Sequence, residues 1–195
     1  RRGVFPLAFT LDHVGPMTRT VADNALLLGM MAGHDPADPG SAAHKSENYA
    51  RQMKKGLSGL TIGYVRHFHE KDQPASAEMA AALDAAAKLL AKEGAKIKTI
   101  TLPSLTEFAG VNRAILMAEA AAIHGNWLRE RPGDYANLTL RRLLPGLFMR
   151  AEDYVQAQRR RRELVAAVEA AGSTPRSHRP PPPPPPPPRR GRRGG

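Results

Sequence analysis

The stretch Leu60-Thr61-Ile62-Gly63-Tyr64-Val65 is rich in β-branched and aromatic residues, which predicts a short β-strand. Residues 76–93 are alanine-rich, with larger apolar side chains at helical spacing, and predict a helix that Gly94 ends. Residues 97–102 then alternate roughly between apolar and polar side chains, as a half-buried strand does. A strand, a helix and a second strand in this order predict a βαβ unit, and therefore an α/β layered fold with a largely buried sheet.

An extended segment, a helix and a loop are predicted ahead of this unit. We expect residues 1–19 to be extended and partly apolar. Thr20, followed three residues later by Asp23, is a capping-box arrangement that opens a helix, and Gly33 is the expected C′ residue of that helix. Residues 34–41 contain two Asp-Pro pairs and a glycine, which predicts a loop.

Two more helices are predicted after the unit. Ser104 and Glu107 make a second capping box, which opens a helix running towards His124. Residues 151–171 form the other long helical stretch.

Charge is distributed unevenly along the 195 residues, which are enough for one domain with its own core. The formal net charge is +11, but residues 173–195 contribute six arginines and no acidic residue. The remaining chain has 29 − 6 = 23 basic residues against 18 acidic residues, a net charge of +5. The body is therefore only mildly basic, and a nucleic-acid partner is expected, if anywhere, at the tail.

Cysteine is absent, which excludes a disulfide framework and thiolate zinc sites and fits a reducing, cytoplasmic location. The longest apolar run, residues 25–32, is far shorter than the roughly 20 residues that span a membrane, so we expect no membrane partner. The first residues lack the apolar core of a signal peptide. They also lack an initiator methionine, which indicates a start within a longer chain.

The tail changes composition abruptly, with nine consecutive prolines at residues 180–188 followed by arginine and glycine. We expect residues 1–172 to form the folded domain and residues 173–195 to be disordered, with polyproline II character. Such a tail is able to bind an aromatic-lined groove on a partner. Proline, arginine and glycine also have GC-rich codons, so a shifted reading frame is the favoured interpretation.

Residues 11–23 read Leu-Asp-His-Val-Gly-Pro-Met-Thr-Arg-Thr-Val-Ala-Asp, and an apolar helix and the loop Ala-Gly-His-Asp-Pro-Ala-Asp-Pro at residues 32–39 follow. This order resembles the segment of amidase-signature enzymes that lies just after their catalytic Gly/Ser-rich region. Residues 57–64 continue the resemblance, which covers about residues 3–170. The positions that match the family motif are Asp12, Gly15, Pro16, Arg19 and Asp23.

The resemblance implies a layered α/β/α fold with a mixed central sheet, and cleavage or transfer of amide C–N bonds without a metal or other cofactor. In the family, a serine attacks the amide, a second, cis-linked serine relays its proton to a neutral lysine, and backbone N–H groups bind the oxyanion. None of the seven serines of this chain lies in a Gly-Ser-Ser-Gly context. We therefore assign no catalytic residue, expect the triad segment before Arg1, and give the five matching residues a structural, supporting role.

Three functions follow as hypotheses. The first is amide hydrolysis of a small carboxamide by the parent enzyme, with this chain inactive alone and only marginally folded, because a divided sheet exposes an unpaired edge. The second is the glutaminase-bearing component of a tRNA-dependent amidotransferase. The third, from a different class, is a basic module that binds RNA or a partner through its arginine clusters and proline tail.

Four further features of the sequence suggest sites, and each has a simpler structural interpretation. Asp12 and His13 are neighbours on extended chain and point apart, so a turn held by Asp12 and Arg19 is favoured over an acid–base pair. His67 and His69 have no third metal ligand at a suitable spacing and are expected in a polar loop. Residues 159–162 are four arginines that sweep most of a helical turn, which favours a solvated face over RNA contact. Trp127, with Arg129 and Arg131 shortly after it, is expected to be a packing anchor rather than part of a cation–π stack or of a substrate cleft.

Overall fold

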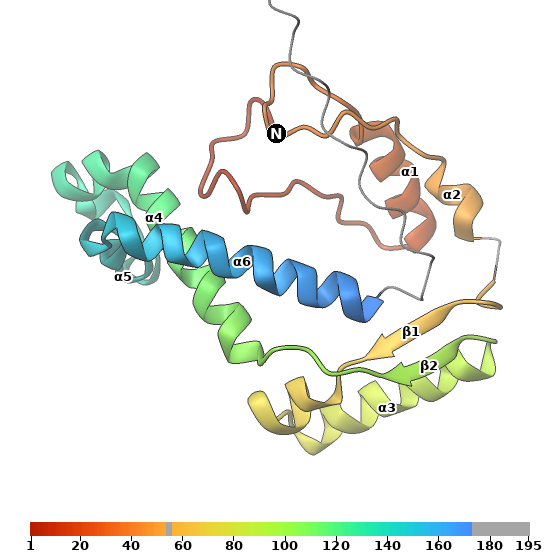
Figure 1. Ribbon diagram of the computed structural model, residues 1–195. Coiled ribbons are helices and arrows are strands. Elements are labelled where there is room, and N and C mark those ends of the chain that lie inside the picture. Colours follow the sequence, from red (N-terminus) through yellow and green to blue (C-terminus); the bar gives the residue numbers. More distant parts are fainter. Residues whose placement is uncertain (54–55, 173–195) are drawn as a thin grey trace, which may run out of the picture.

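The computed structural model describes residues 1–53 and 56–172 (Figure 1). The tail prediction for residues 173–195 lies outside the described residues. Helices dominate the described part, and short 3-10 turns at Pro132–Asp134 and Leu144–Phe148 separate the last helices. In chain order the main elements are α1 (Val21–Met31), α2 (Tyr49–Gln52), β1 (Thr61–Tyr64), a π-helical turn (Phe68–Asp72), α3 (Ala77–Lys92), β2 (Lys96–Thr99), α4 (Leu105–Glu130), α5 (Asn137–Leu143) and α6 (Ala151–Gly172). Among the described residues, none of these helices has the length and apolar character needed to cross a membrane.

The predicted βαβ unit is present, since β1 and β2 pair in parallel and α3 connects them. The side chain of Ser76 caps α3 by accepting a hydrogen bond from the backbone N–H of Met79. At the other end Gly94 adopts φ +103°, a left-handed conformation that favours glycine. The N–H of Gly94 donates to the carbonyl of Ala91, and the N–H of Ala95 donates to that of Leu90, so the helix stops as predicted and the chain turns into β2.

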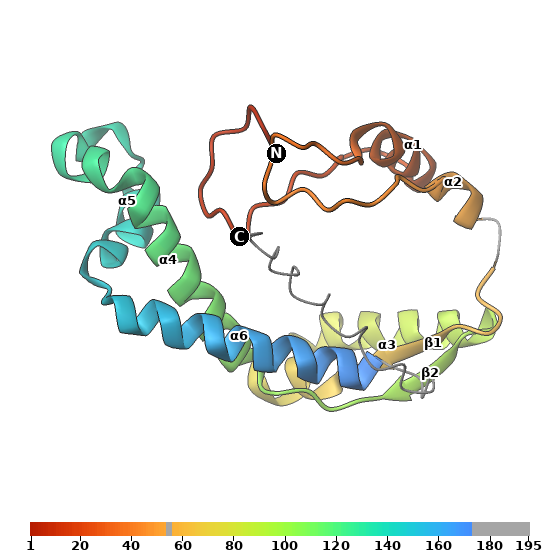
Figure 2. The same cartoon turned by 45° about the horizontal axis from the view of Figure 1, so that its top comes forward.

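A small core lies where α4, α5 and the turn after α5 meet. Its buried residues are Ala120, Leu128 and Leu143, with three partly buried apolar neighbours packed around them. Gly146 makes this close approach possible, because a Cβ there would collide with the carbonyl oxygen of Met117. Helix α6 packs along α4 on the same side of the molecule (Figures 1 and 2).

In both predicted capping boxes the N-cap side chain accepts a hydrogen bond from the backbone N–H three residues later. Thr20 accepts from the N–H of Asp23 and donates its hydroxyl to the Asp23 carboxylate. Ser104 accepts from the N–H of Glu107, but the Glu107 carboxylate does not return to Ser104; it pairs with Arg160 of α6. The ion pair with Arg160 has replaced the local hydrogen bond that a capping box would form from the backbone N–H of Ser104 to Glu107.

The end of α1 agrees with the prediction, and the end of α4 does not. Helix α1 ends at Met31 and its C-cap is Ala32, so Gly33 is the C′ residue. Gly33 does not adopt a positive φ, because the C-cap Ala32 is already extended, with ψ 134°. Helix α4 continues past His124 to Glu130, because the side of the helix that carries Gly125 and Leu128 is buried in the small core.

Candidate functional site

The family-like segment is attached to the helices by one buried carboxylate. Glu119 of α4 is 6% exposed and is the buried charged residue of the described chain. Its carboxylate accepts hydrogen bonds from the N–H of Thr10 at 2.9 Å, the hydroxyl of Thr10 at 2.7 Å and the phenol of Tyr154 at 2.9 Å. Three donors satisfy the buried charge, as burial of a carboxylate requires.

Helix α6 holds the same threonine from the other side. The guanidinium of Arg161 donates to the hydroxyl oxygen of Thr10 at 2.9 Å and to its carbonyl oxygen at 3.0 Å. Burial, followed by the hydrogen bond to Glu119, raises the pKa of the Tyr154 phenol, which keeps it protonated as a donor. We call Thr10, Glu119, Tyr154 and Arg161 the anchor.

The carboxylate of Asp12 closes a turn over residues 7–12, which includes Thr10 of the anchor. It accepts from the backbone N–H of Leu7 at 2.7 Å and of Ala8 at 3.0 Å, and its own N–H donates to the carbonyl of Ala8. His13 Nδ1 lies 2.6 Å from the carbonyl of Leu11, and no hydrogen bond joins its ring to Asp12. The structure therefore does not bring the Asp12–His13 pair together as an acid and a base.

The other motif residues lie on the chain that leads into α1. The carbonyl of Pro16 accepts from the side-chain amide of Asn24 at 3.0 Å, and Asp23 exchanges hydrogen bonds with the N-cap residue Thr20. Gly15 is exposed, and a Cβ there would meet no atom within 4 Å. The guanidinium of Arg19 is exposed and makes no hydrogen bond or ion pair within residues 1–53 and 56–172, so it does not hold the turn with Asp12 there.

A cavity of about 790 Å³ lies beside this segment, between residues 1–14 and the loop at residues 37–40. Neither a serine nor a lysine lines it. The one threonine hydroxyl at its wall, that of Thr10, donates to Glu119 and accepts from Arg161. The cationic guanidinium of Arg161 occupies a lone pair of the Thr10 hydroxyl oxygen and withdraws electron density from it, so we assign this hydroxyl a structural role.

The two histidines after β1 lie in a helical turn, so the predicted polar loop was wrong. Residues Phe68–Asp72 form a π-helical turn, in which the N–H of Gln73 donates to the carbonyl of Phe68 at 3.0 Å. His69 stacks on Tyr64, and Nε2 of His67 lies 4.0 Å from the Asp72 carboxylate. Within residues 1–53 and 56–172, no three His, Asp or Glu side chains gather as they would around a metal ion.

A polar cluster at the end of β1 was not predicted. Asp84 of α3 accepts from the Tyr64 phenol at 3.0 Å and from Arg66 at 2.8 Å. The bond from Tyr64, together with the charge of Arg66, lowers the pKa of the Asp84 carboxyl. All its charges are paired internally, so the cluster ties β1 to α3.

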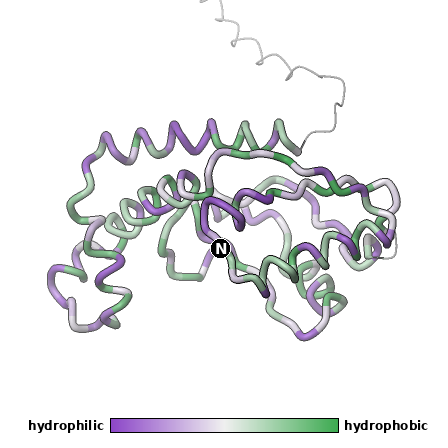
Figure 3. The backbone as a smooth tube through the Cα atoms, turned by 90° about the horizontal axis from the view of Figure 1, so that it is seen from below, coloured by the Kyte–Doolittle hydropathy of each residue, from purple (hydrophilic) through white to green (hydrophobic). Residues whose placement is uncertain are grey.

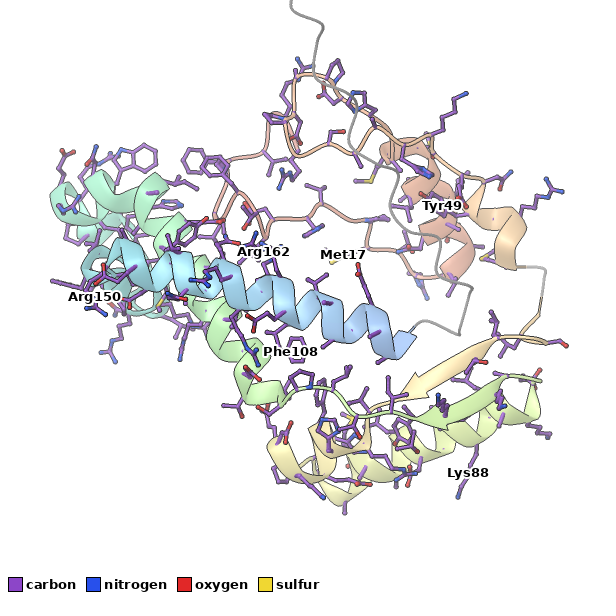
Figure 4. The ribbon with its side chains drawn as sticks, viewed as in Figure 1. Met17, Tyr49, Lys88, Phe108, Arg150 and Arg162 are labelled. Atoms are coloured by element: carbon purple, nitrogen blue, oxygen red, sulfur yellow. The ribbon has the colours of Figure 1, made fainter. Side chains whose placement is uncertain are left out.

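The arginine run is split between the interior contacts and the solvent. Arg160 pairs with Glu107 and Glu163, and Arg161 belongs to the anchor, whereas Arg159 and Arg162 are exposed. The middle of α6 is hydrophilic along the top of Figure 3, and Figure 4 labels Arg162 there. Half of the run is therefore engaged within the chain.

Trp127 packs on the start of the chain. Its ring lies 5.5 Å from that of Phe5 and 6.0 Å from that of His124. Neither Arg129 nor Arg131 stacks on it within the described residues, where the cation–π contact is Arg66 over Tyr64. The contact of Trp127 with Phe5 and the anchor both join the first residues of the chain to α4.

The anchor was not found by sequence reasoning, although one signal was present. Residues 114–123 are apolar at every position except Glu119. A lone carboxylate in an apolar helical run is costly unless it is paired inside the fold. Its partners Thr10 and Tyr154 lie 109 and 35 residues away, and no local pattern identifies them.

Known proteins of similar sequence and structure belong to the family that the motif at residues 11–23 resembles. The Amidase family matches residues 1–174. An amidase of Pseudomonas putida is 39% identical over 158 residues, which cover 80% of this chain and 33% of that protein. A glutamyl-tRNA(Gln) amidotransferase component from Hahella chejuensis is 30% identical over 179 residues, covering 82% of this chain and 37% of the relative.

A solved structure, described as a vestigial protein complex that reveals the origins of an s-triazine catabolic enzyme, is 31% identical. Its TM-score is 0.78, over 88% of this chain and 36% of the solved chain. The chain belongs to the amidase-signature family. It spans about a third of the length of the relatives it matches, so it corresponds to a part of their fold.

Proposed function

We propose that this chain is the part of an amide-cleaving enzyme that supports the active-site segment, and that the parent reaction is hydrolysis of an amide C–N bond. The observation that carries the proposal is the anchor: a buried carboxylate and an arginine fix Thr10, one residue before the family motif at residues 11–23. Similarity to the Pseudomonas putida amidase supports the same reaction. Residues 1–172 would act as one partial domain, in the cytoplasm, with a small carboxamide as the substrate of the whole enzyme.

The chain by itself should not catalyse the reaction. A serine hydroxyl needs a base to become nucleophilic, and in this family a second serine and a lysine provide it. No serine of this chain is followed or preceded by another serine. Two of the motif residues have structural roles: Asp12 holds a turn, and the N–H of Asp23 donates to the N-cap Thr20.

The test is an assay of the purified 195-residue chain for ammonia release from simple carboxamides and from glutamine. We expect no release above the buffer background. Saturable turnover that survives repeated purification would refute the assignment of a purely supporting role.

A second candidate is the amidotransferase component that releases ammonia from glutamine for tRNA-dependent transamidation. Similarity to the Hahella chejuensis protein favours it, at a lower identity than that of the amidase. Once the chain is completed with the rest of a family fold, the two candidates predict different substrates. Preference for glutamine over other carboxamides by more than about tenfold, or about 1.4 kcal/mol, would favour the amidotransferase.

The RNA-binding hypothesis has less support. Arg160 and Arg161 are occupied within the chain, which leaves Arg159 and Arg162 on that stretch to meet a phosphate backbone. If RNA binds, deletion of residues 173–195 should remove most of the affinity and of its salt dependence, because six arginines lie there.

A further inference from the structure

Helix α1 is apolar around its whole circumference and has no buried residue. Its sequence, Val-Ala-Asp-Asn-Ala-Leu-Leu-Leu-Gly-Met-Met, carries only two polar positions, both in its first turn. Met30 is 76% exposed, Val21 75% and Leu26 61%. A helix that is hydrophobic all round normally lies inside a protein, and a contiguous apolar patch on a surface marks an interaction site.

The chain that leads into this helix extends the same patch. Met17, labelled in Figure 4, is 97% exposed, and Val14 is 50% exposed. In Figures 1 and 2, α1 and its neighbour α2 lie apart from β1, β2 and α3. The sheet therefore does not cover this patch within the described residues.

The sheet is open as well. Its two strands pair with each other and with no other strand of residues 1–53 and 56–172, so each has a free edge. Helix α3 lies along one face (Figure 2). Parallel sheets are normally buried on both faces, and a free edge presents unpaired N–H and C=O groups.

We propose that two separate surfaces, α1 with Met17 and the free edges of β1 and β2, both bind the remainder of an amidase fold, and that this remainder binds even when supplied as a separate polypeptide. The matched relatives are about three times as long as the stretch they share with this chain. The unmatched two thirds of such a fold is therefore a source of apolar surface and neighbouring strands of the size required. This inference rests on family membership and not on the proposed amide hydrolysis.

A second copy of this chain fits the surface less well. It would bring only another α1 and another two-stranded sheet. A two-fold axis normal to the sheet pairs identical edge strands antiparallel, and it adds no helix for the uncovered face. Self-association is thus a competing outcome that the experiment has to detect.

The probe is the Pseudomonas putida amidase with its matched stretch replaced by a Gly/Ser linker. The full 195-residue chain is mixed with it, and separately co-expressed with it, so that poor folding of either piece alone does not decide the result. Binding is measured by sedimentation, and hydrogen exchange reports on the amides of α1. We expect a complex with a dissociation constant of about 10 µM or tighter and at least about tenfold slower exchange in α1.

Two matched variants locate the surface. Met30→Glu places a charge in the proposed interface and should weaken binding at least about tenfold, because the methionine side chain is buried there. Met79→Glu makes the same change on α3, where Met79 is 55% exposed, and should leave binding within about twofold. Both residues are exposed in the free chain, so neither variant should unfold it.

Several results would overturn the proposal. One is the absence of a complex in both the mixing and the co-expression experiments at about 100 µM. Another is a complex that Met30→Glu and Met79→Glu weaken equally. Self-association of the chain that Met30→Glu abolishes, without binding to the probe, would assign the surface to a second copy instead.

Discussion

Replacing the buried carboxylate of Glu119 by an amide should release the family-like segment from the helices. In Glu119→Gln the amide oxygen can take the place of Oε1 and keep the bonds from the Thr10 hydroxyl and from Tyr154, both of which donate to that atom. The amide NH₂ then faces the Thr10 N–H, which donates to Oε2 in the wild-type chain. One hydrogen bond to a charged acceptor is lost and a donor is left unpaired, at a cost of about 2 kcal/mol.

The assay is amide hydrogen exchange of the full chain, read at Thr10. A loss of about 2 kcal/mol corresponds to roughly 30-fold faster exchange through local opening. Leu128 in the core of α4 should change far less, because the anchor is not part of that core.

Glu163→Gln is the matched control. It makes the same chemical change on α6, but Glu163 has a side chain that is 62% exposed and pairs with Arg160 at the surface. It should cost less than about 0.5 kcal/mol. Equal exchange rates at Thr10 in wild type, Glu119→Gln and Glu163→Gln would refute the view that Glu119 holds the segment.

Three further predictions concern the scaffold. Gly146→Ala should destabilise the chain by about 1–3 kcal/mol in a urea titration, because its Cβ meets a backbone carbonyl; an unchanged midpoint would show that α4 and the turn after α5 separate freely. Gly94→Ala should cost about 1 kcal/mol through its positive φ, and an unchanged or stabilised variant would contradict that strain. The pKa of Asp84 is lowered in the folded chain, so its contribution to stability is present above the unfolded pKa and is lost as pH falls through the folded value. The stability difference between wild type and Asp84→Asn should therefore shrink on acidification below about pH 4, and a difference that grows there would reverse the sign of the linkage.

The βαβ unit could be predicted because its signals are local. The strand at residues 60–65, the helical spacing over residues 76–93 and the left-handed Gly94 each depend on a few neighbouring residues. The cap at Thr20 is local for the same reason. Propensity and capping chemistry act within one or two turns, which is the range that sequence patterns report.

The anchor could not be predicted in the same way. It joins Thr10 to Glu119, which lies 109 residues further along the chain, and to Arg161, which lies 151 residues further. No local sequence pattern near Thr10 specifies either partner. Tertiary context also overrode local signals at Glu107, whose carboxylate pairs with Arg160 in place of its capping partner. Gly33 lies at the predicted C′ position, but its φ is not positive, so glycine is not required there.

The central claim is that residues 1–172 support an amide-cleaving centre formed by the rest of an amidase fold. The most direct measurement is the rate of amide hydrolysis by a Pseudomonas putida amidase in which the corresponding residues of this chain replace the matched 158-residue stretch. Our account predicts a folded chimera with measurable turnover, which falls when Glu119 is changed to glutamine. A chimera that folds cooperatively but hydrolyses no amide accepted by the parent amidase would contradict it.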